Sequence, residues 1–138
     1  MNDKMTLYDK LGGEQGVRQL VDSFYYIMDT DPLAVRIRNL HPADLAGSRE
    51  KLFFYLSGWL GGPELYIQKY GHPRLRARHL PFSIGELERD EWMRCMIQAL
   101  HALPVEPVVR RQLGNAFYQI AGLMRNKQDE LPDYQFKD

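Results

Sequence analysis

The sequence predicts an all-helical protein folded as one domain. Apolar residues recur at spacings of three and four along most of the 138-residue chain, and the alternation with period two that is typical of strands is nearly absent. Glycine and proline interrupt the periodic stretches where helices would end. There is no internal repeat and no low-complexity linker. We therefore expect a helical domain over residues 1–125 and a flexible tail over residues 126–138, where the periodicity is lost.

The first half of the chain predicts one short helix and two long ones. The short helix covers residues 6–11 and stops at Gly12-Gly13. The next begins near Glu14 and ends before Asp31-Pro32, with an apolar face of Val17, Leu20, Val21, Phe24, Ile27 and Met28. A further stripe contains Leu45, Leu52, Phe53, Leu56 and Leu60, and the sequence Gly61-Gly62-Pro63 ends that helix.

The second half predicts two more long helices. Ser83 and Glu86 have the spacing of a capping box, which predicts a helix start at Ser83 and an end before Pro104. The apolar stripe of this helix is Leu87, Trp92, Met96, Ala99 and Leu100. The last helix opens at Glu106-Pro107, and its inward face is Val109, Leu113, Phe117, Ile120 and Met124. Residues 61–82 are not strongly periodic, and a stretch of this length indicates a functional loop.

Composition disfavours several classes of protein. The 18 basic residues balance the 18 acidic ones, whereas nucleic-acid-binding proteins carry a basic excess. No apolar run approaches the roughly 20 residues that span a bilayer, and the first ten residues contain no apolar signal stretch. Cys95 is the single cysteine, so an intramolecular disulfide is excluded. We expect a cytoplasmic protein, monomeric or homodimeric, that binds neither nucleic acid nor membrane.

The aperiodic stretch contains His79, a candidate metal ligand. It ends the segment 73–79, which starts with proline and could form about two helical turns. A single histidine cannot make a zinc site, and the sequence has no second ligand at His-x₃-His spacing and no cysteine pair. Haem iron needs only one imidazole, because the porphyrin supplies four nitrogens. Judged by residue type alone, an ordinary partly buried histidine is the alternative interpretation.

Three arginines, Arg74, Arg76 and Arg78, lie within five residues of His79. They would suit the two anionic propionates of a haem, and equally a solvated basic surface or a phosphate site. The large aromatic residues on the predicted helix faces could line a flat apolar cofactor or form an ordinary core.

The other three histidines carry weaker signals. His101 lies near the end of a predicted helix, where a surface cation complements the helix dipole. His72 lies in a Gly-His-Pro turn and is expected to be solvated, and His41, which precedes Pro42, could face inward or outward.

One ordered motif resembles a known family. The run Trp59-Leu60-Gly61-Gly62-Pro63, followed by residues 70–82 (YGHPRLRARHLPF), resembles the signature of the group II truncated haemoglobins. Further matches lie at residues 8–13 (YDKLGG), 23–25 (SFY) and 88–96 (ERDEWMRCM). The similarity extends from about residue 7 to about residue 124, which is nearly the whole predicted domain.

The resemblance implies a bacterial two-over-two globin, a shortened globin fold in which a helical sandwich encloses the cofactor and loop replaces most of the proximal helix. It also implies that His79 is the axial ligand of a haem b iron and that Arg78 is the partner of a propionate. Dioxygen and other diatomic molecules are the ligands that the family implies.

The resemblance also assigns residues on the opposite, distal face of the haem. Tyr25 corresponds to the family's distal tyrosine and Trp92 to its distal tryptophan; each could otherwise be a core aromatic. Ser48 occupies the position of the distal histidine of many globins, and Leu52 would form an apolar wall. His41 stands where many members have tyrosine, so the tyrosine-based hydrogen-bond network cannot be assumed. The further expected haem contacts are Phe24, Phe53, Tyr55, Tyr66, Phe82 and Met96, with ordinary core positions as the alternative for each.

Three functions remain compatible with these residues. A haem protein could bind dioxygen reversibly, although two distal donors should slow its release. Slow release favours the second function, redox chemistry on dioxygen, peroxide or nitric oxide with an unidentified electron donor, but no dedicated acid–base pair stands out. The third is a ligand sensor or a haem-free helical interaction module.

Overall fold

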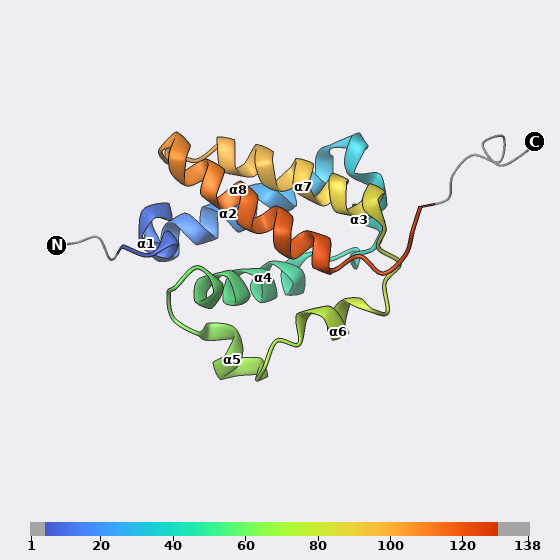
Figure 1. Cartoon of the computed structure of the whole chain (residues 1–138), viewed down its shortest axis with the longest axis horizontal. Coiled ribbons are helices and arrows are strands. Elements are labelled where there is room, and N and C mark those ends of the chain that lie inside the picture. The colour runs from blue at the N-terminus through green and yellow to red at the C-terminus, as the bar shows by residue number, and fades with distance from the viewer. Residues whose placement is uncertain (1–4, 130–138) are drawn as a thin grey trace, which may run out of the picture.

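The computed structural model describes residues 5–129, and every regular element in this range is helical (Figure 1). The elements in chain order are α1 (Leu7–Leu11), α2 (Gly13–Thr30), the 3₁₀ helix η1 (Pro32–Ala34), α3 (Val35–Asn39), α4 (Ala46–Trp59), α5 (Leu65–Tyr70), α6 (Leu75–His79), α7 (Glu86–His101) and α8 (Pro107–Leu123). The all-helical prediction is confirmed. Within the same range, no helix is both long and apolar enough to cross a bilayer.

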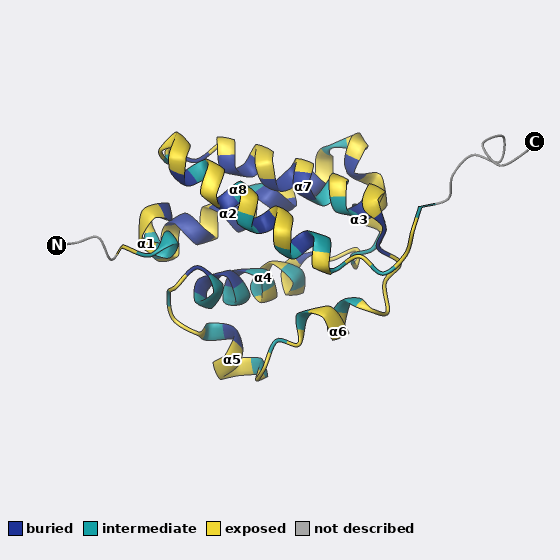
Figure 2. Ribbon diagram, in the orientation of Figure 1, coloured by how far each residue is buried: buried dark blue, intermediate teal, exposed yellow. Residues whose placement is uncertain are grey.

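Two pairs of long helices form the body of the molecule. α2 packs against both α4 and α7, and α7 packs in turn against α8. The buried residues gather where these helices face one another (Figure 2), and Phe24, Met96 and Phe117 are almost completely enclosed there. In Figure 1, α5 lies below α4 and α6 lies below the end of α8; together they form a more open edge of the fold.

The ends of α1 and α2 follow from side-chain and glycine chemistry. The Thr6 hydroxyl accepts a hydrogen bond from the Asp9 N–H at 3.1 Å, and the Asp9 carboxylate accepts one from the Thr6 N–H at 3.3 Å. Gly12 has φ of 111°, a left-handed conformation that glycine adopts without strain, and α2 begins at the next residue. The predicted boundaries of these two helices are correct to within one residue.

The predicted start of α7 at Ser83 is wrong. The helix begins at Glu86, and the Glu88 carboxylate accepts a hydrogen bond from the Gly85 N–H at 2.7 Å. Leu87, expected in the apolar stripe, is 45% exposed, whereas Glu88 is 7% exposed. The carboxylate that closes the helix start lies three residues after Gly85, so Glu88 turns inward and its neighbour Leu87 faces solvent.

Three short elements, η1, α3 and α5, escape prediction because each has six residues or fewer and shows no periodicity. Contacts from distant residues stabilise α3: the Glu91 carboxylate accepts hydrogen bonds from the Ile37 N–H and from Arg36 Nη1, both at 3.0 Å. The stretch expected to be loop therefore contains two short helices, α5 and α6, joined by a turn.

The expected C-terminal tail begins inside the described range. Residues 126–129 run back along the α6–α7 connection, where the Asp129 carboxylate accepts a hydrogen bond from the Leu87 N–H at 3.1 Å. Residues 130–138 of that predicted tail lie outside the described residues.

Candidate functional site

A cavity of about 530 Å³ lies between α4, α5 and α6 on one side and α7 and α8 on the other. Its size falls in the range of roughly 300–1,000 Å³ that is usual for small-molecule and cofactor sites. Most of its lining is aliphatic or aromatic, and a few polar groups reach into it. The histidines that line it are His41 and His79.

α4 contributes one continuous face to the cavity wall. Ser48, Leu52, Tyr55 and Trp59 line the cavity at spacings of three and four residues, which place them on one side of the helix. The sequence reasoning assigned the first three to the site and missed Trp59. It also missed Lys51, which lines the cavity from the same helix. Continuing the spacing of three and four from Ser48 and Leu52 along α4 would have identified Trp59, and Lys51 lies three residues after Ser48 on the same side.

His79 lies at the end of α6 with its imidazole held in one orientation. Nδ1 is 2.7 Å from the Leu75 carbonyl oxygen. A carbonyl only accepts hydrogen bonds, so Nδ1 carries a proton, and in the neutral imidazole the lone pair is then on Nε2. Nε2 has no hydrogen-bond partner among residues 5–129, and the residue is half-buried on the cavity wall. These are the features of an imidazole prepared to ligate a metal.

The surroundings of His79 fit a metal that arrives with ligands of its own. Nowhere in the part of the chain that the structure describes do three His, Cys, Asp or Glu side chains gather as a metal site would require. An iron bound at His79 would therefore take its remaining ligands from a cofactor, as haem iron does from the porphyrin. The largely apolar, aromatic cavity suits a flat macrocycle, so the residues present fit a haem.

Two cations line the cavity from neighbouring parts of its wall, one on α4 and one on α6. Lys51 of α4 and Arg78 of α6 are both exposed and both line the cavity, and Arg78 Nε donates to the Pro73 carbonyl at 2.6 Å. Arg76 is engaged elsewhere, with the carbonyls of Leu123 and Arg125. Of the three arginines near His79, Arg78 is thus the one on the cavity wall.

His41 repeats the local arrangement of His79. Its Nδ1 is 2.9 Å from the Ile37 carbonyl oxygen, so by the same reasoning Nε2 carries no proton. Burial lowers the pKa of His41 below its ordinary value, and the nearby charge of Arg38 lowers it further, while the bond to Ile37 opposes the shift. Neutral His41 therefore offers the cavity a hydrogen-bond acceptor.

The two predicted distal donors occupy different places. Trp92 lines the cavity, with its ring edge-on to Phe24 at a centroid distance of 5.0 Å. Tyr25 is 4% exposed and lies behind the wall, its ring edge-on to His41 at 5.8 Å. Burial raises the pKa of Tyr25, so its hydroxyl stays protonated. Within residues 5–129, neither the Tyr25 hydroxyl nor the Trp92 N–H has a hydrogen-bond partner, so both remain available as donors.

The aromatic and apolar residues expected around a haem divide into two groups. Tyr55, Tyr66 and Phe82 line the cavity. The structure places Phe24, Phe53 and Met96 in the helical core rather than on the cavity wall. Phe53 follows Leu52 by one residue, about 100° further around α4, and its ring packs under the guanidinium of Arg18 at 4.1 Å.

The other two histidines lie on the surface, and part of the predicted core of the last helix lines the cavity. His72 and His101 are exposed, as expected. Ile120 and Met124, predicted as core residues of the last helix, line the cavity together with Phe117. The core face of α8 and the cavity wall are therefore parts of one apolar surface.

The sequence profile of the bacterial-like globins matches residues 6–126. The group 2 truncated hemoglobin YjbI of Bacillus subtilis is 41% identical over 101 residues, which are 73% of this chain and 74% of that protein. Among solved structures, the group II 2-on-2 hemoglobin of Agrobacterium tumefaciens has a TM-score of 0.88 at 43% identity, over 94% of this chain and 100% of that one. The cold-adapted truncated hemoglobin of Pseudoalteromonas haloplanktis TAC125 has a TM-score of 0.87 at 44% identity, over 89% of this chain and 99% of that one. The chain therefore belongs to the bacterial-like globin family, with the two-on-two fold of group II truncated haemoglobins and the haem binding that this membership implies.

Proposed function

We propose that the protein binds haem b through Nε2 of His79 and binds dioxygen or another diatomic molecule on the opposite side of the cofactor. The observation that carries the proposal is the Nδ1–Leu75 carbonyl bond at 2.7 Å, which leaves a free lone pair on an imidazole that faces the cavity. Haem, when bound, supplies an iron that coordinates small diatomic ligands reversibly.

Lys51 and Arg78 are the residues that would hold the two propionates. Both line the cavity from the side formed by α4 and α6, and a guanidinium can bind a carboxylate through two parallel hydrogen bonds. Ion pairs of this kind would orient the macrocycle within the cavity, because its apolar walls alone cannot distinguish one rotation from another.

On the distal side, the chain supplies donors for a polar ligand. The Trp92 N–H lies on the cavity wall, and the Tyr25 hydroxyl lies behind it beside His41. Neutral His41 can accept a hydrogen bond at Nε2 but cannot donate one to the ligand from that atom. Trp92 and Tyr25 are therefore the proposed donors, while Ser48 and Leu52 form the wall from α4.

Reconstitution with hemin tests the axial ligand. The wild-type protein should develop a Soret band, and its pyridine haemochrome spectrum should be that of haem b. His79→Gly should lose the wild-type spectrum and recover it when imidazole is added, because free imidazole can fill the space left by the ring. His72→Gly, which alters an exposed histidine, is the matched control. Wild-type ligation in His79→Gly without imidazole would refute the assignment.

Dioxygen dissociation tests the distal donors. Trp92→Phe and Tyr25→Phe should each speed dissociation by about tenfold or more, because a hydrogen bond to a polar ligand contributes roughly 1.5–3 kcal/mol. Tyr26→Phe is the control: Tyr26 adjoins Tyr25 on α2 but is 66% exposed. An unchanged dissociation rate in Tyr25→Phe would remove Tyr25 from the proposed site.

A second candidate function is redox chemistry on dioxygen, peroxide or nitric oxide. It is favoured by the oxidisable aromatic residues at the cavity: Tyr55, Trp59 and Tyr66 all line it, and Tyr66 lies 4.9 Å from Tyr70, centroid to centroid. Such turnover requires an external electron donor. Peroxide consumption by the reconstituted protein, in the presence and absence of a phenolic reductant, separates this function from simple ligand binding.

A further inference from the structure

Helix α6, which carries His79, is too short to hold its own position. It has five residues, and none of them is buried. A single isolated turn of helix is unstable, because its few hydrogen bonds do not compensate for the conformational entropy lost in forming it. The residue before it, Arg74, has φ of 45°, the only positive φ at a non-glycine residue in the described range 5–129. Contacts from outside the helix must therefore set its position.

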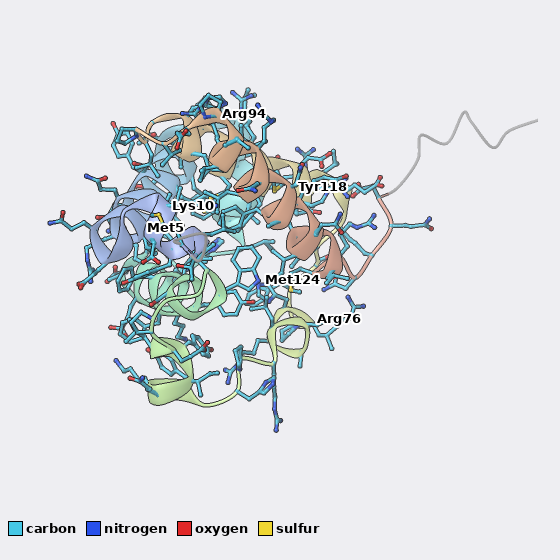
Figure 3. The ribbon with its side chains drawn as sticks, turned by 60° about the vertical axis from the view of Figure 1, so that its left-hand side comes forward. Met5, Lys10, Arg76, Arg94, Tyr118 and Met124 are labelled. Atoms are coloured by element: carbon cyan, nitrogen blue, oxygen red, sulfur yellow. The ribbon has the colours of Figure 1, made fainter. Side chains whose placement is uncertain are left out.

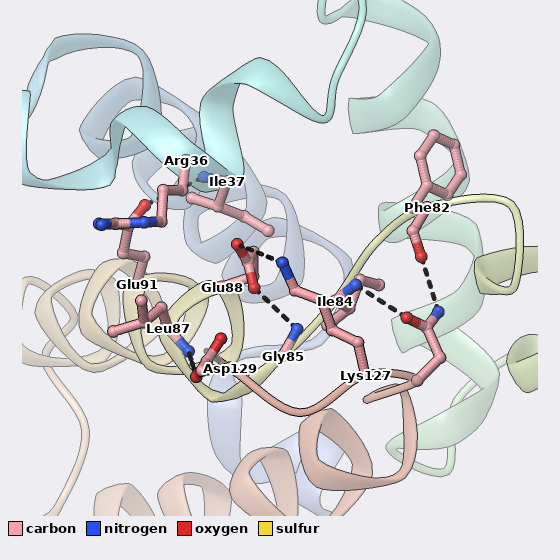
Figure 4. A network of polar contacts seen from close by, with 11 residues as sticks. Arg36, Ile37, Phe82, Ile84, Gly85, Leu87, Glu88, Glu91, Lys127 and Asp129 are labelled. Atoms are coloured by element: carbon pink, nitrogen blue, oxygen red, sulfur yellow. Dashed lines mark hydrogen bonds and ion pairs between the residues drawn. The ribbon is translucent and has the colours of Figure 1, made fainter. Parts of the chain in front are cut away.

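Such contacts come from the segment after α8, residues 124–129, which we call the C-terminal strap. Asn126 contributes one hydrogen bond to α6 itself and three to the connection that follows it. Its Nδ2 donates to the His79 carbonyl at 3.2 Å. Figure 4 shows the contacts at Phe82 and Ile84: Nδ2 also donates to the Phe82 carbonyl at 2.6 Å, and Oδ1 accepts from the Ile84 N–H at 2.9 Å. Its backbone N–H also donates to the Ile84 carbonyl at 2.8 Å. The side-chain amide thus acts as donor and acceptor at three points of one connection.

Two further contacts attach the strap to its surroundings. The guanidinium of Arg76 on α6 donates to the carbonyls of Leu123 and Arg125, at the end of α8, where Figure 3 shows its side chain. On the other side, Lys127 pairs with the buried carboxylate of Glu88 at 3.6 Å, near the start of α7 (Figure 4). The strap therefore joins the end of α8 to both α6 and α7.

The strap and the imidazole bond act on the same residue. The His79 carbonyl is held by Asn126, and the His79 ring is held by the Leu75 carbonyl. With backbone and ring both anchored, the direction of Nε2 is fixed relative to α8. We infer that Asn126 is a positioning residue for His79, acting through the backbone of α6 on the orientation and freedom of the axial ligand. The inference rests on the proposed function in so far as His79 ligates the haem iron.

Hydrogen exchange of the full-length protein, with and without hemin, measures the strap directly. Asn126→Ala should speed exchange by about tenfold or more across residues 75–87, and most at the Ile84 amide, which loses its acceptor. Asn115→Ala, an exposed asparagine on α8, should leave these amides at wild-type rates. If Asn126→Ala exchanged at wild-type rates over residues 75–87, the inference that Asn126 stabilises this region would be wrong.

Resonance Raman spectroscopy measures the effect on the ligand. In the ferrous, ligand-free protein, the iron–histidine stretching band of Asn126→Ala should shift or broaden, and that of Asn115→Ala should match wild type. Asn126→Asp keeps the shape of the side chain and the acceptor for Ile84 but loses both donors, so it should also shift. The Asn126→Asp variant serves as the test of the inference if Asn126→Ala does not fold. A wild-type band in the variant would overturn the inference, whereas a wild-type protein without a Soret band would overturn the proposed function instead.

Discussion

His41 and His79 share one local arrangement, in which Nδ1 bonds to the backbone carbonyl four residues earlier. In each case the carbonyl selects the tautomer of the neutral ring, whose lone pair is then on Nε2. The two residues differ in their surroundings. His79 is the last residue of a short exposed helix, whereas His41 lies beside the buried Tyr25 ring. Residue type alone could not have separated these two sites from the solvated His72 and His101.

Cys95 should be unreactive in the native protein. It is completely buried in α7, and burial raises the pKa of its thiol to about 11. At pH 7.5, on the order of one thiol in three thousand would then be thiolate, the form that attacks alkylating reagents. Iodoacetamide should leave the folded protein unmodified for hours and react promptly in urea, as mass spectrometry would show. Prompt modification of the native protein would contradict the burial.

At the scale of elements, the short helices depend on side chains that are distant in sequence. α3 is bonded by Glu91 of α7, and α6 by Asn126 after α8. α7 itself begins where the Glu88 carboxylate bonds to the Gly85 N–H. Periodicity reports the face of a long helix, but it carries no signal for a five-residue helix that is stabilised from outside.

Removing the Glu91 carboxylate should destabilise the protein. Glu91→Ala leaves the Ile37 N–H without its acceptor, and we expect the free energy of unfolding to fall by about 1–3 kcal/mol. Glu14→Ala is the control, because its 3.5 Å pair with Arg18 is exposed on both sides and should contribute less than about 0.5 kcal/mol. Urea denaturation measures both. Equal effects of the two substitutions would show that the Glu91 contacts contribute no more to stability than an exposed ion pair.

The contact between α1 and α2 requires glycine at position 16. A Cβ there would lie 1.9 Å from the Leu11 carbonyl oxygen, a backbone atom that cannot move aside without shifting α1. Gly16→Ala should therefore destabilise the protein, by roughly 1–3 kcal/mol. At Gly114 in α8, a Cβ would meet nothing within 4 Å. Gly114→Ala should raise stability by about 0.5–1 kcal/mol, because alanine has the higher helix propensity. Thermal or urea unfolding measures both changes. If the two substitutions changed the free energy of unfolding in the same direction, the prediction would be wrong.

At the scale of the whole molecule, the cavity is assembled from both layers of the sandwich. Its walls include α4 and α6 on one side, and Trp92 of α7 and Phe117 of α8 on the other. Aromatic contacts connect the two sides: Trp59 lies 5.1 Å from Phe117, and Trp92 lies 5.9 Å from the same ring. A bound haem would thus contact elements from most of the chain and stabilise the folded state by mass action.

Both tryptophans of the chain, Trp59 and Trp92, line this cavity. Hemin should therefore quench almost all of the intrinsic tryptophan fluorescence and saturate at one equivalent. It should also raise the unfolding temperature by several degrees. His79→Gly should need more hemin for the same quenching, because the axial bond is lost. Fluorescence that persisted at saturation would place at least one tryptophan away from the haem.

Local pattern was sufficient for the long helices and for His79. The spacing of apolar residues predicts α2, α4, α7 and α8, because helix periodicity is a property of neighbouring residues. The ordered motif around residues 59–82 singles out His79 and Arg78, and the structure places both on the cavity wall.

Only the tertiary structure decided what surrounds the histidine. It moved Phe24, Phe53 and Met96 into the core and added Lys51 and Trp59 to the cavity. It also places the side chain of Asn126 against the carbonyl of His79, although the two residues are 47 positions apart in the chain. The sequence by itself determined which residues form the long helices and singled out His79 as the candidate ligand. How freely that imidazole moves depends on hydrogen bonds between distant segments, and no local spacing encodes them.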